Sequence, residues 1–154
     1  MGKDDFVWSG RRIIRKSDRV DIHQAQSNEA IEITRPSAER RAQLHSPLEG
    51  TEISEIKSCN GSLQWVGGQT RPELSGMTSL LQGGDPTVET LLQSQSLLKE
   101  VRDSPHEGMV IYPCDLNNTI VMAFGDSSWA NAMNHKTQAA LMIYLGPPSC
   151  LTPI

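Results

Sequence analysis

The most strongly apolar parts of the chain are two short runs near its C-terminal end, at residues 120–124 and 139–145. Residues typical of turns bound both runs, with two asparagines before the first and Gly-Pro-Pro after the second. β-Branched and aromatic residues within such bounded runs predict strands that are buried on both faces. The polar residues 125–138 between the runs predict a loop that connects the two strands.

Weaker alternation of apolar and polar residues marks the N-terminal part of the chain. Residues 6–24 predict two or three short strands in a meander, with Gly10 at a bulge or a close backbone approach. Residues 24–33 predict a short helix that ends before Pro36, because a residue preceding proline is disfavoured in the helical conformation. Residues 34–50 lack periodicity and predict a loop.

Helical periodicity dominates the middle of the chain. A first helix is predicted from Thr51, which can cap it, to a break at Gly67 and Gly68. A second helix is predicted to begin at Pro72 and a third at Asp85. The apolar stripe of the second helix comprises Leu74, Met77, Leu80 and Leu81. The clearest helical face in the chain belongs to the third helix and comprises Val88, Leu91, Leu92, Gln95, Leu98 and Val101.

The pattern as a whole predicts a mixed α/β fold. A short strand at residues 109–112 leads into the first apolar run, so the C-terminal part is expected to form a partial sheet of two or three strands. The N-terminal β-meander and the three central helices precede this partial sheet. The meander and the loop after it correspond to residues 1–50, the helices to residues 51–105, and the C-terminal part to residues 106–154.

Composition adds limits to this picture. The chain has 154 residues, which suits one domain or two incomplete ones, and its 37% hydrophobic content is thin for a self-sufficient core. The net charge of −4 argues against a generally basic surface for nucleic acid. Residues 1–50 carry nine Lys or Arg and eight Asp or Glu, whereas residues 51–154 carry five and ten. Contacts to nucleic acid would therefore depend on cations concentrated near the N-terminus.

Several classes of site and location are not indicated by the sequence. Three cysteines without a C-x-x-C pair predict neither a zinc site nor a disulfide framework. The sequence contains no phosphate-binding glycine motif, and its four histidines have no ligand spacing. An apolar stretch of the length of a membrane span and a secretory leader are both lacking, so we expect an intracellular protein, cytoplasmic or nuclear, with no membrane partner.

Two groups of residues are candidates for function. The first is a set of cations in the predicted meander, which either contact phosphate groups or merely form a solvated face. It comprises Arg11, Arg12, Arg15, Lys16 and Arg19. The second is Asp126, a carboxylate that follows a predicted buried strand, where it either ligates a metal ion or simply ends the strand.

Two motifs resemble one known family. FGDSSWAN (124–131), followed by KTQAALMIYL (136–145), resembles the start of the ribonuclease H domain in copia-type LTR retrotransposon polyproteins. NGSLQWVGGQTRPELSGMTSLLQ (60–82) resembles the end of the reverse transcriptase region of those polyproteins. The two motifs occur in the family's order and at about its spacing, and the resemblance covers roughly residues 6–145.

The resemblance implies a fragment of a reverse transcriptase and ribonuclease H polyprotein. Residues 1–50 would be the end of the polymerase palm with a linker, in which FVWSGRRI (6–13) resembles the hairpin that holds the primer end. Residues 51–105 would be thumb-like or connection-like helices, and residues 106–154 an incomplete ribonuclease H-like domain. The remainder of the polyprotein would be a partner, and the five cations would bind an RNA–DNA hybrid or duplex weakly.

The resemblance also assigns Asp126 as a catalytic carboxylate that ligates Mg²⁺ or Mn²⁺. Two-metal cleavage of RNA needs several acidic residues, and this sequence supplies only the first of those that the family uses. We therefore expect the chain to be inactive by itself and to hold no ion stably. The alternative is a non-catalytic module that binds nucleic acid or protein through its basic hairpin and helices.

Overall fold

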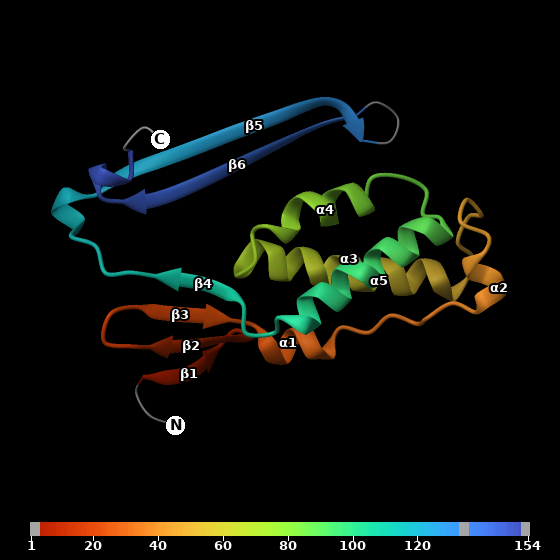
Figure 1. The fold of residues 1–154 in the computed structure, drawn as a ribbon, viewed down its shortest axis with the longest axis horizontal. Coiled ribbons are helices and arrows are strands. Elements are labelled where there is room, and N and C mark those ends of the chain that lie inside the picture. Colours follow the sequence, from red (N-terminus) through yellow and green to blue (C-terminus); the bar gives the residue numbers. More distant parts are fainter. Residues whose placement is uncertain (1–3, 133–135, 152–154) are drawn as a thin grey trace.

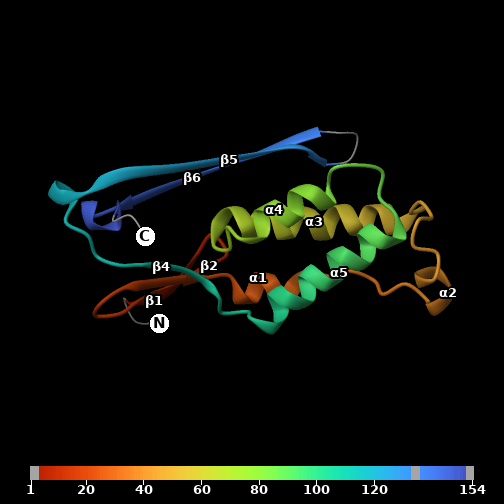
Figure 2. The ribbon, with the colours of Figure 1, turned by 45° about the horizontal axis from the view of Figure 1, so that its top comes forward.

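A computed structural model describes residues 4–132 and 136–151, and it has a mixed α/β fold (Figure 1). A four-stranded antiparallel sheet with the order β1-β2-β3-β4 lies at one end of a group of helices. A separate two-stranded sheet, β5-β6, runs along one side of the molecule (Figures 1 and 2). The coarse prediction of an N-terminal meander, central helices and a C-terminal sheet is confirmed.

The four-stranded sheet joins two distant parts of the sequence. β1 (Asp5–Trp8), β2 (Arg11–Arg15) and β3 (Val20–His23) form the predicted meander. β4 (Gly108–Ile111) matches the strand predicted at residues 109–112, but it pairs with β3 and not with the C-terminal strands. The C-terminal sheet therefore has only two strands among the described residues.

The turn between β1 and β2 explains Gly10. Ser9 and Gly10 have φ angles of 50° and 75°, which is typical of a two-residue hairpin turn and favours glycine. A Cβ atom on Gly10 would lie 2.9 Å from the ring of Trp65. The predicted close approach is thus present, with a ring from the central helices as the partner, and the residue lies in a turn instead of a bulge.

The helical part contains the three predicted helices and two shorter ones. α3 (Thr51–Gln69), α4 (Leu74–Leu81) and α5 (Val88–Asp103) are the central helices. α1 (Ala25–Ala30) is shorter than predicted, and α2 (Ala38–Arg41) lies in the predicted loop. The side chain of Ser37 caps α2, and Arg40 forms an ion pair with Glu52 at 2.7 Å. Polar contacts therefore stabilise this short helix, whose sequence has no apolar periodicity.

The predicted helix ends were wrong at several positions. Thr51 was predicted to cap α3, but the residue at the cap position is Gly50, which has a φ of 50°. α3 also continues through Gly67, where it was predicted to end. A Cβ atom on Gly67 would lie 3.1 Å from the Ser75 Oγ atom, so this glycine allows α4 to pack closely and does not end the helix. α4 begins two residues after Pro72, and α5 begins after Thr87.

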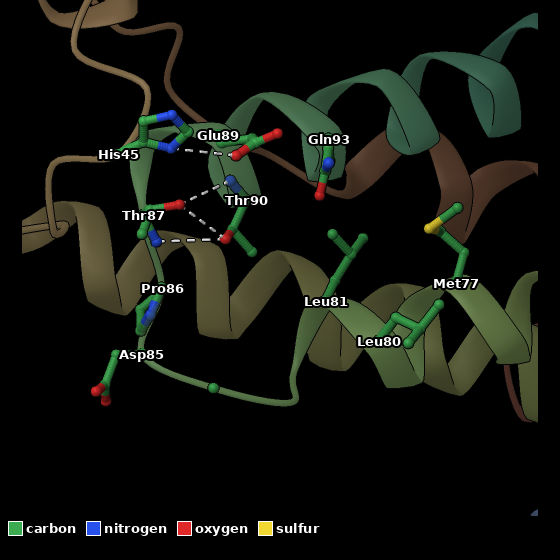
Figure 3. A pocket seen from close by; sticks show the side chains of 11 residues that line it. His45, Met77, Leu80, Leu81, Asp85, Pro86, Thr87, Glu89, Thr90 and Gln93 are labelled. Carbon is green, nitrogen blue, oxygen red and sulfur yellow. Dashed lines mark hydrogen bonds and ion pairs between the residues drawn. The ribbon is translucent and has the colours of Figure 1, made fainter. Parts of the chain in front are cut away.

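Thr87 starts α5 because its hydroxyl group can reach the exposed amide groups of the first turn. The hydroxyl accepts a hydrogen bond from the Thr90 amide, and the Thr90 hydroxyl accepts one from the Thr87 amide (Figure 3). This reciprocal arrangement satisfies two backbone donors that would otherwise lack partners. The predicted start at Asp85 was therefore two to three residues early.

The core lies between α3, α4, α5 and the segment after α1. Its larger cluster comprises Ile31, Cys59, Leu63, Val66, Leu74, Leu81, Leu97, Leu98 and Val101. A smaller cluster comprises Leu48, Ile56, Val88 and Leu91. The predicted stripe on α4 was partly wrong, since Met77 and Leu80 are exposed and Thr78 is buried with its hydroxyl on the Leu74 carbonyl at 2.9 Å.

The C-terminal hairpin differs most from its prediction. β5 (Ile120–Ala132) and β6 (Lys136–Gly146) extend through most of the predicted loop at 125–138. Their apolar side chains were expected to be buried on both faces, yet Val121 and Leu141 are 69% and 68% exposed. β5 and β6 pair only with each other among the described strands, and most of their apolar side chains are exposed, although Met122 is buried.

Two short 3-10 helices flank this hairpin, at Leu116–Asn118 and Pro148–Leu151. Asp115 caps the first of them by accepting a hydrogen bond from the Asn117 amide at 3.0 Å. None of the described helices is long and apolar enough to cross a membrane.

Candidate nucleic-acid interface

The five predicted cations lie together on β2 and the turn that follows it, but they do not share one face. Successive side chains of a strand point to opposite sides of its sheet. Arg11 and Arg15 therefore lie on one face of β2, and Arg12 lies on the other. Lys16 and Arg19 occupy the turn that leads to β3.

The charge of Arg12 is neutralised by Asp5 on the neighbouring strand β1. Its Nε and Nη2 atoms donate hydrogen bonds to the two carboxylate oxygens of Asp5, at 2.9 and 2.7 Å. The hydrogen bond from Arg12 is the main cause that lowers the pKa of Asp5, and the same contact raises the pKa of Arg12. A bidentate pair of this kind leaves little of the guanidinium charge for a phosphate group.

Lys16 and Arg19 share another carboxylate. Both form an ion pair with Asp21 of β3, and the Nε atom of Arg19 lies 2.8 Å from its Oδ1 atom. Arg19 also lies 3.7 Å from Asp18. Hydrogen bonds, first from Lys16 and then from Arg19, lower the pKa of Asp21. Three of the five cations thus have acidic partners that the sequence prediction did not include.

Arg11 and Arg15 differ from these three. The guanidinium carbon of Arg11 lies 4.6 Å from the ring centroid of Trp8, and its Nη1 atom donates to Gln69 Oε1 at 2.7 Å. The side chain of Arg15 is exposed and has no ion pair or hydrogen bond with any other described residue. These two arginines are the cations that remain available to a phosphate group.

A different kind of chemistry lines the opposite face, in an open cleft of about 510 Å³ beside β3 and β4. His23 is buried there, with its ring edge-on to His106 at a centroid distance of 4.9 Å. The Nδ1 atom of His23 accepts a hydrogen bond from the Ala25 amide at 3.3 Å. This bond needs the neutral ring, because a protonated Nδ1 atom has no free lone pair.

The environment of His23 lowers its pKa below the usual 6.5, mainly through burial. The charges of His106 and Arg12 lower the pKa further, whereas Asp5 and Asp21 oppose the shift. As the pH falls, the unfolded chain therefore takes up a proton on this histidine before the folded chain does. The stabilising contribution is complete above about pH 6.5 and is lost as the pH falls toward the pKa of the folded state.

We therefore expect His23→Asn to flatten the acid side of the stability profile. The free energy of unfolding of the wild-type chain should fall more between pH 7.5 and pH 5 than that of the variant, as measured by urea denaturation. Asparagine keeps an acceptor for the Ala25 amide and does not titrate. His45→Asn, at an exposed side chain, should leave the wild-type profile unchanged. Parallel profiles for wild type and His23→Asn would contradict the prediction.

Asp126 lies away from this sheet and does not end a strand. It is exposed within β5, where it pairs with Ala140 of β6. The predicted position after a buried strand was wrong, because β5 continues for six more residues to Ala132. No group of three or more His, Cys, Asp or Glu side chains that could hold a metal ion occurs within residues 4–132 and 136–151. Asp126 by itself does not provide the several oxygen ligands that each ion of a two-metal centre needs.

The polar residues of the 60–82 motif have structural roles. Thr70 donates its hydroxyl hydrogen to Gln24 Oε1 at 2.8 Å, and both side chains are buried. Arg71 is also buried, and its Nη1 atom donates to the carbonyl and the hydroxyl oxygen of Ser104, each at 3.2 Å. Its Nη2 atom lies 2.9 Å from Glu107. Arg71 thereby connects the start of α4 to the end of α5 and to the segment that enters β4.

A cleft of about 540 Å³ lies between α4 and the start of α5 (Figure 3). Met77 and Leu80 contribute its apolar side, and the hydroxyl groups of Thr87 and Thr90 are already engaged in capping α5. His45 Nδ1 lies 3.6 Å from Glu89 Oε2, on a side chain that is almost fully exposed. The cations predicted from the sequence lie on the sheet and do not line this cleft.

Comparison of the chain with protein-family models, with curated proteins and with solved structures found no match. The membership of the copia-type family expected from the two motifs therefore stays a prediction.

Proposed function

We propose that the chain is a section of a copia-type retrotransposon polyprotein, from the end of the reverse transcriptase to the start of the ribonuclease H domain. The two motifs at 60–82 and 124–145, in the order of the family, support this proposal. In the complete polyprotein the activities would be RNA-directed DNA synthesis and cleavage of RNA–DNA hybrids. The hairpin β5-β6 would there be the first part of a larger sheet, whose further strands would pair with its free edges.

The role that we propose for the described residues is contact with the nucleic-acid backbone. The observation that carries this role is the pair Arg11 and Arg15, which lie on one face of β2 without a carboxylate partner among the described side chains. Such arginines suit phosphate groups of an RNA–DNA hybrid or a duplex, independently of sequence. With so few available cations, the binding is expected to be weak.

The second candidate function is a non-catalytic binding module for nucleic acid or protein. The cations of β2 and the turn after it support this candidate, because contact with a phosphate backbone requires no catalytic group. Both candidates use the same basic surface. They differ in whether Asp126 contributes to cleavage once the rest of a ribonuclease H domain is supplied.

Replacing Arg15 tests the backbone contact. Arg15→Gln is expected to weaken binding to an RNA–DNA hybrid about equally for all sequences, and to reduce the slope of log affinity against log salt by about 0.9. Fluorescence anisotropy with a labelled hybrid over a salt series measures both quantities. The control is Arg35→Gln, which makes the same charge change in the segment between α1 and α2 and should have a smaller effect.

A second control removes an ion pair without a change of net charge. The double variant Asp5→Asn, Arg12→Gln eliminates the bidentate pair of β1 and β2 and should bind the hybrid about as well as the wild-type chain. Binding that does not depend on salt, or that Arg15→Gln and Arg35→Gln weaken equally, would show that this face is not the contact surface.

A further inference from the structure

One face of the four-stranded sheet combines aromatic side chains with the two available arginines. The register pairs Phe6 with Ile13 and Trp8 with Arg11, so these four side chains lie on the same face. The face continues across β3 and β4 through Val20, Ile22, Met109 and Ile111. Its most exposed aromatic side chain is Trp8, at 62%, and Phe6 is 41% exposed.

The opposite face has a different character. It carries the ion pair between Asp5 and Arg12, the carboxylate of Asp21 and the buried ring of His23. The aromatic side chains of the meander therefore gather on the face that is poor in ion pairs. We call the face with Phe6, Trp8, Arg11 and Arg15 the aromatic face.

Trp8 is held in place while most of its surface stays open. Arg11 lies over the ring at 4.6 Å, and Gln69 of α3 fixes the guanidinium group by a hydrogen bond of 2.7 Å. Trp65, also on α3, packs against Gly10 in the turn that follows Trp8. The indole ring is thus positioned from one side by the helical part of the molecule, and the rest of the side chain remains exposed.

We infer that the aromatic face binds an unpaired nucleic-acid strand, with bases stacked on Trp8 and Phe6 and phosphate groups held by Arg11 and Arg15. This inference rests on the proposed function and adds the strand type. Exposed aromatic side chains on a sheet, next to cations, are the features that single-strand binding uses. A duplex cannot use the rings in this way, because its bases already stack on each other.

The charges of this face favour a nucleic-acid strand over a second copy of the chain. Arg11 and Arg15 lie four residues apart on one strand, about 13 Å at 3.3 Å per residue. A partner that covers the apolar side chains between them must bring negative charge, which phosphate groups do. Two copies that met through this face around a two-fold axis would bring four arginines close together in a single contact.

The inference is tested with the complete chain and two labelled nucleic acids, a short thymidine oligonucleotide and an RNA–DNA hybrid. Trp8→Leu should weaken binding of the oligonucleotide about 5- to 100-fold, because it removes the stacking ring. Trp8→Phe should retain part of the affinity. Val7→Ala, on the same strand but the opposite face, is the matched control and should bind as the wild type does. Thermal unfolding checks that each variant remains folded.

The hybrid separates this inference from the proposed function. Arg15→Gln should weaken binding of both nucleic acids, whereas Trp8→Leu should weaken binding of the oligonucleotide more than binding of the hybrid, because only unpaired bases can stack on the ring. Hybrid binding without oligonucleotide binding, or oligonucleotide binding unaffected by Trp8→Leu, would overturn the inference and leave the proposed function standing. Failure to bind either nucleic acid would overturn both. A concentration-dependent dimer that Trp8→Leu abolishes would assign the aromatic face to a second copy and would also overturn the inference.

Discussion

Gly108→Ala is expected to lower the free energy of unfolding by roughly 3 kcal/mol, at the upper end of the usual cost of overpacking. A Cβ atom at this position would lie 2.1 Å from the carbonyl oxygen of Ile22 and 3.0 Å from the Cα atom of His23. Both are backbone atoms of β3, which cannot move without disturbing the β3–β4 ladder. Urea denaturation at neutral pH measures the loss.

Gly125→Ala provides the control for this substitution. Gly125 is also a strand glycine, in β5, and a Cβ atom there would meet no other atom within 4 Å. The change should therefore be neutral or slightly stabilising, because alanine restricts the unfolded chain more than glycine does. Equal effects of the two substitutions would show that the close approach of β3 and β4 at Gly108 does not limit stability.

The chain by itself is expected not to cleave the RNA strand of an RNA–DNA hybrid, with either magnesium or manganese present. Asp126 is a single exposed carboxylate, and each divalent ion of a two-metal centre needs several oxygen ligands. When the chain is extended with the rest of a ribonuclease H domain, we expect cleavage. In that longer chain Asp126→Asn should abolish cleavage, because the amide keeps the shape of the side chain and removes its charge.

The same charge change elsewhere gives the control for Asp126. Asp85→Asn, at an exposed residue before α5, should leave the cleavage rate of the longer chain unchanged. Release of a labelled RNA fragment measures the rate. Cleavage by the 154-residue chain itself, or a longer chain that is indifferent to Asp126→Asn, would contradict the proposed role of Asp126.

The helical part of the fold was largely predictable because its signals are local. The apolar face of α5 repeats with the helical period, and the residues at Val88, Leu91, Leu98 and Val101 are buried as the period requires. Helix ends were less predictable because they depend on which side chain reaches the free amides. Thr87 does so for α5, whereas Pro86 beside it led to the prediction of an earlier start, at Asp85. On α4, the helical period placed four apolar residues in one stripe, but only two of them, Leu74 and Leu81, are buried.

The sheets depended on information that no local pattern contains. The strand β4 was predicted from its composition. Its partner β3 could not be predicted in the same way, because β3 precedes helices α1 to α5 in the sequence and β4 follows them. The apolar runs of β5 and β6 correctly indicated strands. Their composition is the same whether or not another layer covers them, so their exposure could not be predicted.

The candidate site was also predictable only where its signals are local. The cluster of cations was visible in the sequence, whereas its partition between two faces follows from strand alternation and register. Asp5 and Asp21 neutralise Arg12, Lys16 and Arg19 from the two neighbouring strands, and only the pairing of those strands brings them close. The alternating Phe-Val-Trp of β1 was the available signal for the aromatic face. It was interpreted as a strand and as part of a segment that resembles the primer-holding hairpin, without a role for its aromatic side chains.

The pairing of β3 with β4 also has a consequence for the order of folding. β3 precedes α1 and β4 follows α5, so the fourth strand cannot join the sheet until the chain through the helices has been synthesised. A flexible loop of that length would slow the pairing, because its ends meet rarely. Helices that pack first bring the ends together, and Arg71 then holds the segment that leads into β4. We therefore expect refolding in which helical signals recover before the sheet is complete.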